Sequence, residues 1–238
     1  MNDEGYEVKF ERTEVFNFEG ALRGMRNPKN SWNKCDSFWS TDTSGNRTYF
    51  IGENDLKLAQ ALIRGGSEHR KFMRQIFVSV DITAPLYWWK EFDTYKVGTT
   101  ANSTSTMHKI TSKPISISDG CFETDDYHPD LTIADDVNIG KRVNSFINDL
   151  EQLRQKYLAT GDKRYWKELI RWVPCGWIQT RTVTMNYENI LTICSQRKTH
   201  KLNEWSGLDN ADKDCFIKWA HSLPYANELL FYGDGETA

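Results

Sequence analysis

Residues 75–109 change character twice, and this change constrains the fold more than any other part of the sequence. Residues 75–82 are rich in β-branched and aromatic side chains that nearly alternate with polar ones, which is typical of a strand with one buried face. Ala84 and Pro85 then end the strand. Because proline is favoured in the first turn of a helix, a short aromatic helix is expected over residues 86–93, with Trp88 and Trp89 in the core.

The segment after Gly98 is unusually polar. Seven of the eleven residues from 99 to 109 are Ser, Thr or Asn, and the segment has almost no apolar bulk. Such a loop buries little apolar surface, so we interpret its hydroxyls and amides as ligand-binding groups. A phosphate-bearing ligand suits them. The other interpretation is an ordinary solvated turn, in which Ser105 is a turn residue.

Composition predicts one α+β domain over residues 1–238. A chain of this length with 39% hydrophobic residues can bury a sizeable core, and strands and helices do not alternate as in a βαβ protein. With a net charge of -3, the protein lacks the overall positive charge that is typical of proteins that bind a nucleic-acid polymer. We find no apolar run of membrane-spanning length and no signal peptide, so a cytoplasmic protein without a membrane partner is expected.

The cysteines and histidines predict neither a disulfide framework nor a metal centre. None of the five cysteines is spaced as C-x-x-C, and the five histidines include no H-E-x-x-H motif. Reduced thiols are therefore expected.

Further elements follow from hydrophobic spacing and from turn residues. Asn54 or Asp55 is expected to cap a helix that Gly65 and Gly66 end, and residues 111–140 form a long surface excursion. Strands are expected at residues 7–16 and 177–185, and helices at residues 18–26, 143–157, 162–172, 187–198 and 211–223, with an exposed hairpin tip at 41–46.

Two groups of cations are candidate anion ligands. Residues 23–32 gather Arg23, Arg26 and Lys29 at a helix end, which indicates either a solvated turn or an anion-binding corner. Arg74 is expected to enter the buried strand, where its head group needs a partner: a ligand, Asp81 or Glu91.

Two motifs resemble those of the flavin-dependent thymidylate synthases. That family carries a loop RHRxxSxNExSxRY after a strand of this kind, and Asn102 and Ser105 match its Asn and Ser. A second family motif, N-x-R-x(8)-R, follows a later strand. Here Asn186 and Arg197 match its first and last residues, whereas Glu188 stands at the middle Arg. The resemblance covers roughly residues 53–110 and 177–230.

The resemblance implies a mostly antiparallel sheet flanked by helices, and a homotetramer with shared active sites. It also implies FAD as cofactor, deoxyuridine monophosphate as the pyrimidine deoxynucleotide, methylenetetrahydrofolate as carbon donor and NADPH as reductant. Methylation and hydroxymethylation of deoxyuridylate both remain open.

The same resemblance suggests roles for individual residues. Thr94, Tyr95 and Lys96 stand near the family's Arg-His-Arg and, with Arg74, are candidate FAD contacts. Ser105 and His108 are candidate catalytic residues. The candidate substrate contacts are Asn102, Ser103, Ser105 and Arg197, with Arg23 and Arg26.

The departures from the family pattern leave a second interpretation open. A glutamate at position 188 repels phosphate unless it points elsewhere, and Ser or Met cannot reproduce the bidentate grip of Arg. Either other cations compensate, with Arg74 and Lys90 among the candidates, or the protein binds and sequesters a nucleotide without catalysis. A structural oligomer without a ligand is a third interpretation, against which the polar loop argues.

Overall fold

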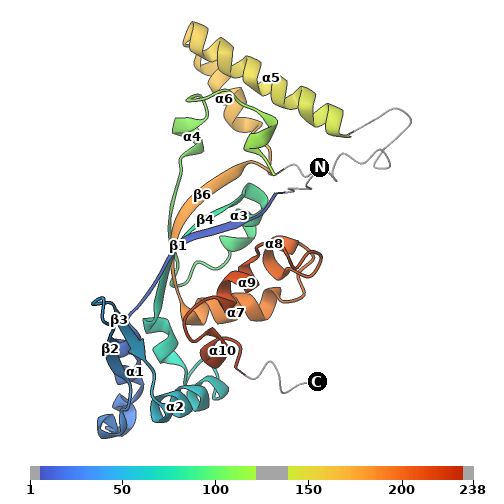
Figure 1. Ribbon diagram of the computed structural model, residues 1–238. Coiled ribbons are helices and arrows are strands. Elements are labelled where there is room, and N and C mark those ends of the chain that lie inside the picture. Colours follow the sequence, from blue (N-terminus) through green and yellow to red (C-terminus); the bar gives the residue numbers. More distant parts are fainter. Residues whose placement is uncertain (1–5, 122–138, 233–238) are drawn as a thin grey trace. The chain divides into compact units, whose positions relative to one another are not determined.

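The computed structural model describes residues 6–121 and 139–232, so residues 122–138 of the expected surface excursion lie outside the described part (Figure 1). The chain divides into two compact units. The first unit comprises Met1–Lys9, Ile82–Thr94 and Asn102–Arg181, and the second comprises Phe10–Asp81, Tyr95–Ala101 and Thr182–Ala238. Among the described residues, no helix combines the length and the apolar character that crossing a membrane requires.

The expected α+β class with an antiparallel sheet is confirmed. A four-stranded sheet has the order β1 (Lys9–Phe16), β4 (Phe77–Pro85), β6 (Ile178–Asn186), β5 (Thr100–Ser103). The alternation of apolar and polar residues that predicted β4 matches the burial of its side chains, because every second residue from Val78 to Ala84 is buried. The strand runs on through Pro85, which directly precedes α3 (Leu86–Phe92).

The first unit has a helical hairpin and an aromatic core. Helix α5 (Ile139–Thr160) and helix α6 (Lys163–Arg171) lie side by side, and Gly161 between them has a left-handed φ of 67° (Figure 1). Ile147 and Leu150 of α5 pack with Leu169 of α6 in one buried cluster. The core assignment of the tryptophan pair is confirmed, since Trp88 and Trp89 of α3 are 0% and 1% exposed.

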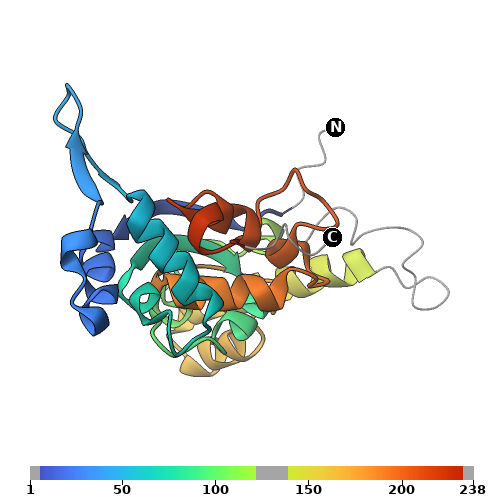
Figure 2. The ribbon, with the colours of Figure 1, turned by 90° about the horizontal axis from the view of Figure 1, so that it is seen from below.

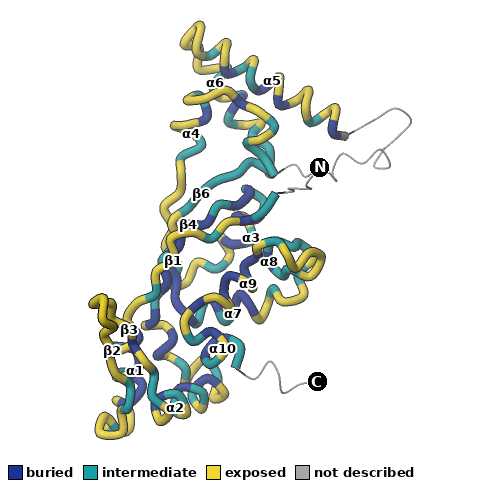
Figure 3. The backbone as a smooth tube through the Cα atoms, in the orientation of Figure 1, coloured by how far each residue is buried: buried dark blue, intermediate teal, exposed yellow. Residues whose placement is uncertain are grey.

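The second unit contains most of the helices and a separate hairpin. Strands β2 (Phe38–Thr41) and β3 (Arg47–Phe50) pair antiparallel, with Phe38 opposite Phe50, as the expected tip at residues 41–46 requires. This hairpin projects from the helices of the unit and is largely exposed (Figures 2 and 3). The helices are α1 (Phe18–Met25), η1 (Asn27–Lys29), η2 (Trp32–Lys34), α2 (Glu53–Arg64), η3 (Lys71–Gln75), α7 (Tyr187–Arg197), α8 (Asn203–Ser206), α9 (Phe216–His221) and α10 (Ala226–Leu229).

Of the two helix caps that the local sequence predicts, one is confirmed. Asn186 caps α7 as predicted, because its side chain accepts a hydrogen bond from the Asn189 backbone N–H at 2.9 Å. The predicted cap of α2 was wrong. Gly52 occupies that position, and the carboxylate of Asp36 instead accepts from the backbone N–H groups of Asn54 and Asp55.

The polar segment after Gly98 is more ordered than the predicted loop. It forms β5, in which all four residues are exposed, and then α4 (Thr106–Lys109). An exposed strand at the edge of a sheet needs no apolar side chains, which explains why hydrophobic spacing missed it. Ser105 caps α4 by accepting from the backbone N–H of His108.

Candidate functional site

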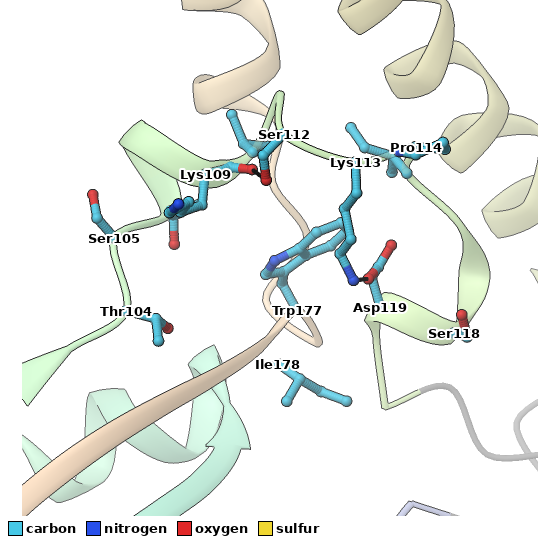
Figure 4. A pocket seen from close by; sticks show the side chains of 13 residues that line it. Thr104, Ser105, Lys109, Ser112, Lys113, Pro114, Ser118, Asp119, Trp177 and Ile178 are labelled. Carbon is cyan, nitrogen blue, oxygen red and sulfur yellow. Dashed lines mark hydrogen bonds and ion pairs between the residues drawn. The ribbon is translucent and has the colours of Figure 1, made fainter.

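A pocket of about 320 Å³ in the first unit is the strongest candidate site (Figure 4). Its lining combines five hydroxyl side chains, two lysines and one tryptophan: Thr104, Ser105, Thr106, Ser112, Ser118, Lys109, Lys113 and Trp177, with Asp119 and four apolar residues. Most of these residues come from the segment between β5 and the end of η4 (Ile117–Asp119), and Trp177 immediately precedes β6.

Backbone hydrogen bonds hold the two sides of the pocket together. The backbone N–H and the hydroxyl of Thr104 both reach the carbonyl of Thr180, at 2.9 and 3.2 Å, and the Gln179 amide donates back to the Thr104 carbonyl at 2.8 Å. The Trp177 carbonyl accepts from the Leu86 N–H at 2.9 Å. The start of β6 therefore holds the hydroxyl segment, and the backbone of Trp177 is held in turn by α3.

The charges of the pocket favour an anion. Lys113 pairs with Asp119, whose second oxygen accepts from the Ser116 N–H at 2.9 Å, so these two side chains neutralise each other (Figure 4). Lys109 is exposed and forms no ion pair with any residue in 6–121 or 139–232. One uncompensated ammonium beside hydroxyl donors suits a phosphate.

Ser105 and His108, the two predicted catalytic residues, lie together. The Ser105 hydroxyl is 2.7 Å from His108 Nδ1 and accepts the backbone N–H of His108 at 3.2 Å. Because a serine oxygen can accept two hydrogen bonds, either Ser105 or His108 Nδ1 can be the donor in this contact, according to the tautomer of the ring. Ser105 lines the pocket, whereas Asn102 and Ser103 are exposed on β5 and do not.

In the second unit, two residues that the sequence placed at separate motifs come into contact. Arg197 Nε donates to the Tyr95 hydroxyl at 3.0 Å, and the guanidinium lies 5.2 Å from the ring centre of Trp205. Tyr95 also donates to Gln196 at 3.0 Å. Arg197 is the last residue of α7, and its guanidinium contacts the side chains of Tyr95 and Trp205.

Glu188, which stands where the similar motif has its middle arginine, is neutralised. Arg70 Nε donates to it at 3.0 Å, and the guanidinium of Arg74 is 3.9 Å away. The expected position of Arg74 was wrong, because the residue lies in η3 rather than in the strand; of the partners expected for it, Asp81 pairs with Arg12. Two cations and one anion leave this cluster with one net positive charge.

The remaining predicted contacts are scattered. Arg26 is only 3% exposed and pairs with Asp55 at 2.5 Å, so its guanidinium stabilises the fold, while Arg23 is exposed beside it. Thr94 hydrogen-bonds within its own helix end, through its N–H and its hydroxyl to the Glu91 carbonyl. Lys96 is exposed. Within the described ranges, no group of three or more His, Cys, Asp or Glu residues is arranged to hold a metal ion.

The sequence reasoning missed Lys109, Lys113 and Trp177. No spacing rule singles out a lysine in a polar segment or a tryptophan next to a strand. The enrichment in hydroxyls before position 109 was the only signal for the pocket, and it identified one wall.

Comparisons with known proteins support the fold. No family model and no curated protein matches the sequence. Two crystal structures of the flavin-dependent thymidylate synthase ThyX from Helicobacter pylori, both with FAD and dUMP, are similar. One has a TM-score of 0.58 at 13% identity and covers 95% of this chain and 97% of that one. The other has a TM-score of 0.59 at 14% identity and covers 95% and 98%.

The chain has the flavin-dependent thymidylate synthase fold. The resemblance inferred from two partial motifs is therefore confirmed at the level of architecture. At this sequence identity the likeness carries no residue roles, which rest on the geometry above.

Proposed function

We propose that this protein is a divergent thymidylate synthase-like enzyme that transfers a one-carbon unit to a pyrimidine deoxynucleotide, by methylation or hydroxymethylation of deoxyuridylate. The pocket at the start of β6 carries this proposal. Lys109 and the hydroxyls of Ser105 and Thr106 suit a nucleotide phosphate, and the indole of Trp177 suits stacking on a base.

The second unit offers residues that fit FAD. The Arg70–Arg74–Glu188 cluster keeps one net positive charge for a pyrophosphate, and Arg74 is 48% exposed. Tyr95 adds a ring, and Arg197 adds a third cation. Bound flavin would supply the reducing chemistry, while these side chains bind and orient it. The folate donor, NADPH and a homotetramer belong to the same proposal.

A second candidate function is nucleotide binding without catalysis. The carboxylate at Glu188 favours it, because this side chain stands at a cation position of the family motif and its Oε2 is buried without a hydrogen-bond partner in the described part of the chain. A protein that binds nucleotide but has lost the flavin fits this observation.

Cofactor content and nucleotide affinity distinguish the two functions. For the enzyme, we expect flavin absorbance near one FAD per chain, and binding of deoxyuridine monophosphate in calorimetry. Lys109→Gln should weaken this binding by about tenfold, as the loss of a charge-assisted contact predicts. The control Lys167→Gln removes an exposed lysine of α6 that does not line the pocket and should change little.

The outcomes separate cleanly. A colourless protein that takes up no added FAD but is stabilised to heat by the nucleotide supports sequestration. If neither FAD nor the nucleotide shifts the melting temperature, both functions are refuted. Equal affinities of the Lys109→Gln and Lys167→Gln variants would remove this pocket from the proposal.

A further inference from the structure

A second pocket, of about 280 Å³, lies beside the β2–β3 hairpin in the second unit. Its walls include Trp32, Phe38 and Trp39, which are 50%, 58% and 43% exposed, together with the buried Tyr49. Large aromatic side chains exposed together are uncommon on a protein surface and usually mark a binding site. None of these residues lines the pocket of the proposed nucleotide site.

Most polar groups around this pocket already have partners. Glu19 accepts from the Trp39 indole at 2.9 Å, and the side chains of Ser37 and Cys35 both donate to the buried Asp55, at 2.6 and 3.1 Å. A ligand therefore gains little by hydrogen bonding to them. Burial raises the pKa of the Tyr49 hydroxyl to about 12, so that group stays neutral.

Two guanidinium groups are left for a ligand, beside the second carboxylate oxygen of Glu19. Arg23 is exposed and has no ion-pair partner among the residues that the structure describes. Arg26 lines the pocket and is only 3% exposed. Its Nη2 nitrogen has no hydrogen-bond partner in the described part of the chain. Guanidinium groups beside aromatic walls match a planar ring that carries an anionic acceptor.

We propose that this pocket binds a small aromatic carboxylate. The ring would pack against Trp32 and Trp39, and the carboxylate would pair with Arg23 and face Arg26. A nucleotide fits less well, because among the lining carboxylate and hydroxyl groups only the second oxygen of Glu19 is left to accept from its sugar hydroxyls, while Ser37 is already bound to Asp55. The pocket size suits one ring or two small ones, near the lower limit of ligand pockets.

Fluorine NMR of the full chain with 4-fluorobenzoate tests this site. We expect saturable binding with one site per chain and a Kd on the order of 0.1–1 mM, as suits a ligand of this size. Arg23→Gln and Trp32→Leu should each weaken binding by about tenfold. The neutral 4-fluorobenzamide should bind about as weakly to the unmodified protein as the carboxylate binds to Arg23→Gln.

A matched control comes from α6. Trp172 directly follows this helix, is 57% exposed and, like Trp39, donates its indole N–H to a glutamate, but it lies outside the pocket. Trp172→Leu should leave the affinity within about twofold. Circular dichroism should show that each variant is folded. All three substituted residues are exposed, so their side chains carry little of the core.

The assignment would be overturned if 4-fluorobenzoate showed no saturable binding or if the neutral amide bound equally well. It would also be overturned if Trp32→Leu and Trp172→Leu weakened the binding of 4-fluorobenzoate equally. The same holds if deoxyuridine monophosphate displaced the probe and 4-aminobenzoate did not. Self-association that Trp32→Leu abolishes would likewise show that a second copy covers the aromatic residues. The proposed enzymatic function can fail without affecting this test, because Lys109 is not involved.

Discussion

Replacing Asp55 by Asn should unfold the second unit far more easily than its single lost charge suggests. Asp55 is 0% exposed and pairs with Arg26, which is 3% exposed, at 2.5 Å. The same carboxylate accepts from the Ser37 hydroxyl at 2.6 Å, from the Cys35 thiol at 3.1 Å and from two backbone N–H groups. The amide cannot compensate the guanidinium, which then remains buried and charged.

The expected magnitude follows from that burial. Removing one partner of a buried ion pair costs about 3–5 kcal/mol, because the other charge is left in a low-dielectric environment. For a chain of this size this corresponds to a loss of roughly 6–20 °C in melting temperature. The matched control is Glu53→Gln on the same helix, since Glu53 pairs with Lys57 but both side chains are at least 70% exposed. An exposed pair contributes less than about 1 kcal/mol.

Urea unfolding at pH 7, followed by tryptophan fluorescence, measures the difference. An Asp55→Asn variant whose free energy of unfolding lies within about 1 kcal/mol of Glu53→Gln would refute the assignment of a buried, structurally required pair. The double variant Arg26→Met with Asp55→Asn removes the buried charge as well. It should recover part of the loss but not all of it, because the donors around Ser37 still lose a charged acceptor.

The pH dependence provides an independent check. Burial by itself raises the pKa of Asp55, but hydrogen bonds from Ser37, Cys35 and Arg26 outweigh it and hold the pKa below 3.8. A lowered pKa in the folded state stabilises the protein above pH 3.8, and this stabilisation is lost as the pH falls through the folded-state pKa. The gap between the unmodified protein and Asp55→Asn should therefore narrow in acid.

Two further predictions concern other parts of the chain. Hydrogen bonding from Arg154 lowers the pKa of Glu151 to about 2, so Glu151→Gln should lower the melting temperature at pH 7 and have little effect near pH 2; equal effects at both would contradict this. Gly98→Ala should cost more than about 1 kcal/mol in urea unfolding, because φ is +75° and the new Cβ would lie 2.9 Å from Asn186 Nδ2. Gly45 has a φ of +86° but open space around it, so Gly45→Ala measures the cost of the backbone conformation alone. If both variants lose the same free energy of unfolding, the steric clash at position 98 contributes nothing.

The local elements were predictable where a short stretch of sequence contains its own reason. The alternation in β4, the proline before α3 and the Asn186 cap act through neighbours within four residues, so the sequence displays both partners of each interaction. The misplaced cap of α2 shows the limit. Asp36, the group that satisfies its first N–H groups, lies far enough upstream that no capping pattern includes it.

The candidate site was predictable only in part. The density of hydroxyl residues pointed to the wall around Ser105, and a partial motif pointed to Arg197. Each residue's partner was absent from its motif. Arg197 bonds to a tyrosine 102 positions earlier, and Glu188 bonds to an arginine 118 positions earlier. Residues this far apart in the sequence are brought into contact by the tertiary fold, so local spacing cannot predict the contact.

The sequence by itself determined the α+β class, the main strands and helices and the chemistry of the polar segment, because hydrophobic period, proline and glycine act on the adjacent backbone. The tertiary structure alone decided which charges are neutralised. It paired the guanidinium of Arg26 with the buried Asp55 and that of Arg70 with Glu188, and among the described residues it left Lys109 without an ion pair in the pocket that Trp177 also lines. Coulomb energy and desolvation depend on distance and burial in three dimensions, and neither quantity is a property of position along the chain.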